Sequence, residues 1–109
     1  MEIRYSNNKL KKYFTNLNEL KRIIDNNWAK KIKYYLDSLY AANDFEIFLS
    51  TCLDHPEQLK GLNNAWTLRI NANARLLFEL ENKEPKLSKY IIIKGVYDNH
   101  EGKYNWYIK

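Results

Sequence analysis

Histidine is the side chain best suited to proton transfer near neutral pH, and this chain has two, His55 and His100. An unperturbed imidazole has a pKa of about 6.5, so it can give or take a proton in that range. The one thiol, Cys52, can form neither an intrachain disulfide nor a thiolate cluster for zinc. Three scattered glycines cannot form a phosphate-binding loop. We therefore expect acid–base chemistry without a metal or a cofactor.

Positive charge is unevenly distributed along the chain, whose net charge is +5. Residues 1–36 hold nine Lys/Arg and three Asp/Glu. Residues 37–60 hold one Lys/Arg and five Asp/Glu, and residues 61–109 hold eight Lys/Arg and five Asp/Glu. A basic segment beside an acidic one suggests an anionic partner. A nucleic acid is favoured over a membrane, because no lipid-directed amphipathic helix is apparent. The alternative is a lysine-rich helix face that is only solvated.

Length and composition favour a single domain over residues 1–109, with one packed core and any active site in a surface groove. Aromatic residues make up 15% of the chain, which is too many for a disordered tail. The longest apolar runs, such as Ile91-Ile92-Ile93, are far shorter than the roughly 20 residues of a membrane span. They are also shorter than the apolar region of a signal peptide. We therefore expect a cytoplasmic protein.

Apolar periodicity predicts a strand at residues 2–5, followed by helices. Spacings of three and four indicate one helix over about residues 8–25 and a second over 28–42, which together would form a helical hairpin. A break is expected at Asp25-Asn26-Asn27. Asn43-Asp44 can cap a short helical segment at 45–49.

From residue 65 the apolar period becomes two, as a strand with one buried face requires. The strands expected from this pattern are residues 66–70, 75–80, 90–97 and 104–108. The first two would form a hairpin through Asn71-Ala72-Asn73, and residues 81–88 would form a loop. The predicted fold class is α+β, with the N-terminal strand and helical hairpin packed on a small, mainly antiparallel β-sheet.

Three spaced motifs carry a resemblance to a known family. They are Leu59-Lys60-Gly61, then Trp66-x-Leu68-x-Ile70-x-x-Asn73-x-Arg75-Leu76-x-Phe78-Glu79, then Ile93-x-x-Val96-x-Asp98-x-His100. This frame resembles the HigB-type toxins of the RelE/ParE superfamily over roughly residues 8–101. The resemblance implies a RelE-like fold and a toxin of a type II toxin–antitoxin pair.

HigB-like toxins are ribosome-dependent endonucleases of mRNA, held inactive by a cognate antitoxin. The resemblance thus implies as partners an antitoxin, the ribosome with its mRNA, and operator DNA bound through the antitoxin complex. Members of the ParE branch share the fold but poison DNA gyrase, so the fold does not settle the target. Two alternatives therefore stay open, a non-nuclease toxin that inhibits a protein such as gyrase and a catalytically degenerate binding module.

Metal-independent RNA cleavage needs a deprotonated 2′-hydroxyl, a stabilised phosphate and a protonated 5′-oxygen. The resemblance implies that His55 matches the family's loop histidine, and that Asp98 and His100 match its closing Asp-Tyr-His motif. Asn99 stands at the tyrosine of that motif. The proton donation and base stacking of a phenol are then missing unless Tyr97 or Tyr104 supplies them.

Arg75 is expected to bind phosphate and stabilise its charge together with Lys60, because the planar guanidinium can bind phosphate through two bonds. The alternative for Arg75 is a structural ion pair with a carboxylate such as Glu79. Exposed aromatic rings beside lysines can stack on the bases of single-stranded RNA. The residues predicted to contact RNA are Lys60, Arg69, Tyr97, Tyr104, Lys30 and Lys33.

Overall fold

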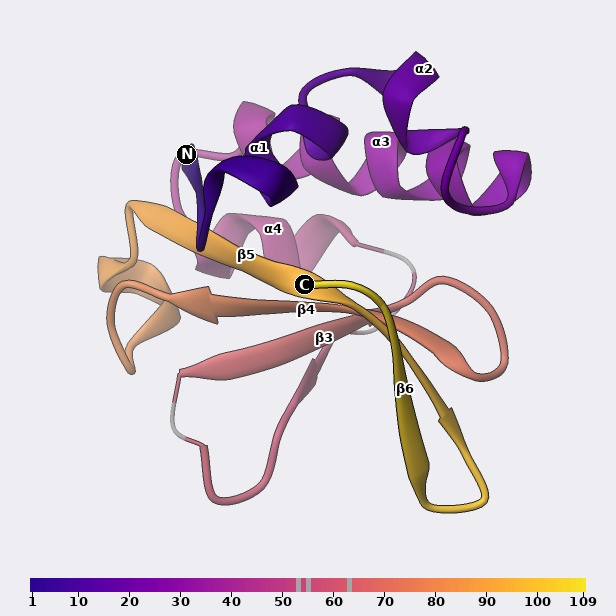
Figure 1. Cartoon of the computed structure of the whole chain (residues 1–109). Helices are drawn as coiled ribbons and strands as arrows, with labels where there is room; N and C mark the ends of the chain where they lie inside the picture. Colours follow the sequence, from indigo (N-terminus) through magenta and orange to yellow (C-terminus); the bar gives the residue numbers. More distant parts are fainter. Residues whose placement is uncertain (53, 55, 63) are drawn as a thin grey trace.

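The computed structural model describes residues 1–52, 54, 56–62 and 64–109. Helices lie on one face of a single sheet, and the other face of the sheet is left open (Figure 1). In chain order the elements are β1 (Glu2–Tyr5), α1 (Asn8–Phe14), α2 (Leu17–Leu20), α3 (Asn26–Ala41), α4 (Phe45–Thr51), β2 (Glu57–Gln58), β3 (Ala65–Arg69), β4 (Ala74–Leu80), the 3₁₀ turn η1 (Pro85–Leu87), β5 (Tyr90–His100) and β6 (Lys103–Ile108).

The sheet has the strand order β1-β5-β4-β3-β2, and β6 also pairs with β5. Only the β1–β5 pair is parallel among these described strands. β1 and β6 pair with the first and second halves of one edge of β5, and β4 occupies its other edge. The α+β class and the mainly antiparallel sheet are confirmed. β5 runs three residues beyond its predicted end, and the two-residue β2 was not predicted.

The prediction of one helix over residues 8–25 is wrong, because the chain breaks there into α1 and α2. The side chain of Asn16 accepts hydrogen bonds from the backbone N–H groups of Asn18 and Glu19 and so begins a new helix. Asp25 caps α3 in the same way, and Asp44 caps α4. Polar side chains therefore set the helix boundaries, and the spacing of apolar residues does not reveal them. Within the described residues, no helix is both long and apolar enough to cross a membrane.

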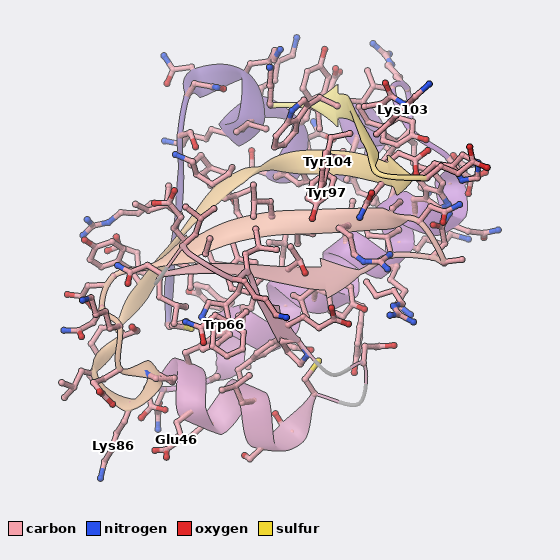
Figure 2. All side chains as sticks on the ribbon, turned by 90° about the horizontal axis from the view of Figure 1, so that it is seen from below. Glu46, Trp66, Lys86, Tyr97, Lys103 and Tyr104 are labelled. Carbon is pink, nitrogen blue, oxygen red and sulfur yellow. The ribbon has the colours of Figure 1, made fainter. Side chains whose placement is uncertain are left out.

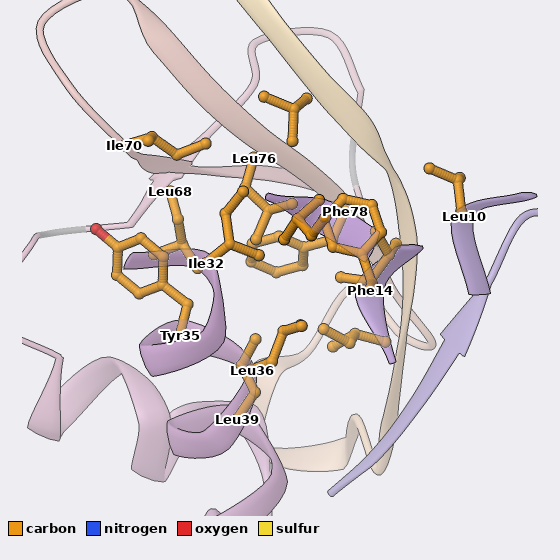
Figure 3. Close-up of a cluster of buried hydrophobic side chains, with 14 of the residues drawn as sticks. Leu10, Phe14, Ile32, Tyr35, Leu36, Leu39, Leu68, Ile70, Leu76 and Phe78 are labelled. Atoms are coloured by element: carbon orange, nitrogen blue, oxygen red, sulfur yellow. The ribbon is translucent and has the colours of Figure 1, made fainter. Parts of the chain in front are cut away.

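The core lies between the helices and the covered face of the sheet (Figure 3). Helix α3 contributes side chains at spacings of three and four, which meet alternating side chains of β3 and β4. The buried tyrosine of this helix, Tyr35, donates a hydrogen bond from its hydroxyl to the backbone carbonyl of Arg69. That bond fixes the end of β3 against α3. The core side chains labelled in Figure 3 are Leu10, Phe14, Ile32, Tyr35, Leu36, Leu39, Leu68, Ile70, Leu76 and Phe78.

A bulge in β5 changes which of its side chains face the helices. Leu77 of β4 pairs with Gly95 and the next residue, Phe78, pairs with Ile93, so one extra residue lies in β5 at Lys94. Before the bulge the odd-numbered Ile93 points into the core. After it the even-numbered Val96 does so, and Tyr97 is turned to the open face.

Gly95 is the residue that permits this bulge. Its φ is 149°, a conformation that side-chain-bearing residues rarely adopt. A Cβ atom there would also collide with the carbonyl oxygen of Ile108 and touch the ring of Trp106. The close approach of β6 to β5 therefore depends on a missing side chain.

We expect Gly95→Ala to lower the free energy of unfolding by about 3 kcal/mol, since backbone strain and overpacking each cost about 1–3 kcal/mol. Chemical denaturation followed by circular dichroism measures this change. Gly102→Ala is the matched control: it has a φ of 80° with open space around the Cβ position, and we expect a loss of about 1 kcal/mol from strain alone. Equal losses for the two variants would contradict the proposed close packing at Gly95.

Candidate functional site

Charged and aromatic side chains share the open face of the sheet. Arg69 on β3 pairs with Arg75 on β4, Arg75 pairs with Tyr97 on β5, and Tyr97 pairs with Trp106 on β6. These four residues form one row across four strands. Residues paired directly across a sheet project from the same face. The row therefore joins two guanidinium groups to two aromatic rings, from segments that are far apart in the sequence.

A groove of about 500 Å³ lies on this face. Its lining residues are Leu59, Lys60, Leu62, Leu77, Tyr97, Tyr104 and Trp106. The ring of Tyr97 lies 5.5 Å from that of Tyr104 and 5.4 Å from that of Trp106, measured between centroids. Seen from the open side of the sheet, Tyr97 and Tyr104 lie next to each other (Figure 2). Tyr104 is 64% exposed and Trp106 41% exposed, so both rings offer apolar surface to a ligand.

The two arginines of the row are held in different ways. A guanidinium nitrogen of Arg69 lies 3.4 Å from a carboxylate oxygen of Glu57, and both side chains are more than half exposed. Arg75 donates to the backbone carbonyls of Asn71, Ala72 and Ala74 at 2.8–3.1 Å. No ion pair of Arg75 with a carboxylate such as Glu79 is found among the described residues, and Glu79 pairs with Lys94 at 3.6 Å.

Glu57 was not among the predicted site residues. It pairs with Thr67 across β2 and β3, which places its carboxylate on the open face beside Arg69. In the sequence it is one of several acidic residues in an acidic segment, and no local pattern separates it from the others. The strand pairing of β2 is what brings it to the site.

Tyr97 is the least exposed polar side chain of the groove, with 6% of its surface accessible. Burial is the main cause that raises the pKa of its hydroxyl. The neighbouring Tyr104 and Glu57 also raise this pKa, whereas Arg75 lowers it. These effects show that Glu57 and Arg75, from two other strands, lie within electrostatic reach of the Tyr97 hydroxyl.

Asp98 and His100 lie away from this groove. Strand alternation places them on the face opposite that of Tyr97, and Asp98 pairs with the buried Ala74. One carboxylate oxygen of Asp98 accepts a hydrogen bond at 3.3 Å from the hydroxyl of Tyr107, whose ring packs on Trp28. The side chain of His100 is largely exposed at the tip of the β5–β6 hairpin. The closing motif therefore does not join Arg75 in one cluster.

The remaining predicted residues fall into three places. Lys60 lines the groove, and Arg69 lies across from Arg75 in the row described above, outside the groove lining. Lys30 and Lys33 are exposed on α3, in the helical layer on the other side of the sheet, and Lys33 pairs with Asp37 at 2.8 Å. His55 lies outside the described residues.

The arrangement suits an anionic, aromatic ligand. Arg69, Arg75 and Lys60 can bind phosphate oxygens, and the rings of Tyr104 and Trp106 can stack on planar groups. Glu57 offers a carboxylate that can accept a proton, and Tyr97 offers a hydroxyl that can give one. Among the described residues, no group of three or more His, Cys, Asp or Glu side chains is placed to hold a metal ion.

Comparison with known proteins gives a likeness in structure only. No protein-family model matches the sequence, and no curated protein matches it significantly. A chain from the YoeB–YefM complex of Staphylococcus aureus superposes with a TM-score of 0.57 at 21% sequence identity, over 92% of this chain and 97% of that chain. At this identity the likeness concerns the fold, so we conclude that the chain has the RelE-like α+β fold expected from its sequence.

Proposed function

We propose that this chain is the toxin of a type II toxin–antitoxin pair and that it cleaves mRNA on the ribosome. The observation that carries the proposal is that Glu57 pairs with Arg69, and that strand pairing joins Arg69 through Arg75 to the aromatic groove. These residues offer two of the groups that metal-independent RNA cleavage requires, a base for the 2′-hydroxyl and cations for the phosphate. The likeness of the fold to a chain of the YoeB–YefM complex, which is a toxin–antitoxin complex, supports the same assignment.

The two arginines would hold the scissile phosphate. Two guanidinium groups directly across from each other repel, and the exposed ion pair of Arg69 with Glu57 contributes only about 0–1 kcal/mol. A phosphate can therefore take the place of Glu57 on Arg69 at little cost. The freed carboxylate then stands beside the bound nucleotide, where it can take the proton of the 2′-hydroxyl.

The groove would hold the neighbouring bases. Leu77 and Tyr97 line it together with Tyr104 and Trp106, whose side chains are exposed to solvent. Stacking on aromatic rings tolerates every base, because each base has a π face. Lys60 at the groove can bind an adjacent phosphate.

The partners follow from this assignment. A cognate antitoxin would cover the toxin and link it to operator DNA, and the finer assignment to the HigB type rests on the sequence motifs. Lys30 and Lys33, on the helical layer, would contact ribosomal or messenger RNA away from the groove. Such a protein would act in the cytoplasm, where translation takes place.

Induced expression tests the function. We expect the wild type to arrest growth and protein synthesis and to create new 5′ ends within translated mRNA. Glu57→Gln removes the proton acceptor while keeping its shape, and Arg75→Ala removes a phosphate contact. Each change should slow cleavage by about 100-fold or more, as the loss of a general base or a transition-state donor does. Arg22→Ala, an exposed arginine of the helical layer, is the matched control and should cleave normally.

Other outcomes of this experiment would assign other functions. Growth arrest without new 5′ ends would contradict the nuclease and favour a protein target such as gyrase. Expression without any effect on growth would favour a binding module that has lost catalytic activity. The double variant His55→Ala/His100→Ala belongs in the same experiment, because the sequence motifs propose proton transfer by these histidines.

RNA affinity tests the groove. We expect Tyr104→Ala to weaken the binding of a short single-stranded RNA by about 1–3 kcal/mol, the usual contribution of one stacked base. Fluorescence anisotropy at fixed salt, with 2′-O-methyl RNA that cannot be cleaved, measures this. Tyr40→Ala removes a ring of α3 that is 74% exposed, against 64% for Tyr104, and should leave the affinity unchanged. Equal effects of the two changes would argue against base stacking in the groove.

A further inference from the structure

We propose that the hydroxyl of Tyr97 is the acid that protonates the departing 5′-oxygen during RNA cleavage. This inference rests on the proposed function and assigns a role within the same site. The sequence offers either Tyr97 or Tyr104 in place of the family tyrosine, whose position holds Asn99. The structure separates these two candidates.

The position of Tyr97 supports this role. It stands directly across from Arg75 in the strand pairing and is the link in the row between the phosphate-binding arginines and the stacking rings. Glu57 and Arg75 both act electrostatically on its hydroxyl, so the proposed base and one phosphate-binding arginine lie within electrostatic reach of the proposed acid. No hydrogen bond to another described residue engages this hydroxyl, and its ring is fixed by Tyr104 and Trp106.

The other candidate donors of the described chain are less suitably placed. Tyr104 is mostly exposed, so its ring is free to stack but its hydroxyl is not held in position. The hydroxyl of Tyr107 already donates to Asp98 on the opposite face. His100 lies on that face as well, beside Glu101 at 3.9 Å. A tyrosine hydroxyl is protonated at neutral pH, and burial raises the pKa of Tyr97 further, so this residue holds a proton that it can give to the leaving group.

The reaction balances with these groups alone. Glu57 takes the proton of the 2′-hydroxyl, and the 2′-oxygen forms a bond to phosphorus. The bond from phosphorus to the 5′-oxygen breaks, and its electron pair takes the proton of Tyr97. The products are a 2′,3′-cyclic phosphate and a free 5′-hydroxyl. Arg75 stabilises the phenolate until solvent returns the proton that Glu57 has released.

A substrate with a better leaving group tests the assignment. Ribosome-bound synthetic mRNA is prepared with oxygen or with sulfur at the bridging 5′ position of the mapped cleavage site, because a thiolate departs without protonation. We expect Tyr97→Phe to cleave the oxygen substrate about 100-fold more slowly than the wild type, but the sulfur substrate within about threefold. Glu57→Gln should be slow on both substrates, since base catalysis is still required.

Two controls separate an acid from a structural role. Tyr90→Phe makes the same change at the other end of β5, beside Arg4, and should cleave both substrates normally. His55→Ala is tested in parallel, and the sulfur leaving group should not restore any cleavage rate that this variant loses on the oxygen substrate. Rescue of His55→Ala but not of Tyr97→Phe would overturn the assignment to Tyr97.

Normal cleavage of the oxygen substrate by Tyr97→Phe would also overturn it, while leaving the nuclease function intact. Slow cleavage of both substrates by Tyr97→Phe would give this tyrosine a positioning role in place of proton transfer. A wild type that cleaves neither substrate would overturn the proposed function and this inference together.

Discussion

The extra residue in β5 decides which side chains reach the open face of the sheet. Side chains alternate strictly along a strand, so a shift of one residue exchanges its two faces. The bulge at Lys94 and Gly95 makes that exchange halfway along β5. The first half of the strand thus buries Ile91 and Ile93 against the helices, and the second half turns Tyr97 to the groove. Without this shift Tyr97 would point into the core and Arg75 would have no aromatic neighbour in its row.

The other end of the row across the open face carries the positive charges of Arg69 and Arg75. Arg69 and Arg75 repel each other, and each is stabilised by weak or local partners, an exposed carboxylate in one case and the carbonyls of a turn in the other. Among the described residues, neither arginine is paired with a buried acid. The open face therefore keeps positive charge available to an anion, near the exposed rings of Tyr104 and Trp106.

Much of the fold could be predicted from periodicity. The first strand, the long helix α3, the β3–β4 hairpin and the last strand are found where the apolar spacing placed them. The predictions that were wrong or missing have local causes, which the spacing of hydrophobic residues does not reveal. Asn16 continues the polar face of the expected helix, yet its side chain caps a new one. β2 is too short for a pattern, because two residues show no alternation.

The sequence by itself determined the α+β class, the basic character, and the aromatic and arginine residues that a site for RNA would need, because these follow from composition and spacing along the chain. Only the tertiary structure decided which of these residues meet. It brought Glu57 beside Arg69, placed Tyr97 across from Arg75, and turned Asp98 and His100 to the other face. The physical reason is that strand pairing and a bulge join residues from distant segments, and neither the register of a sheet nor the position of a bulge is written in a local pattern.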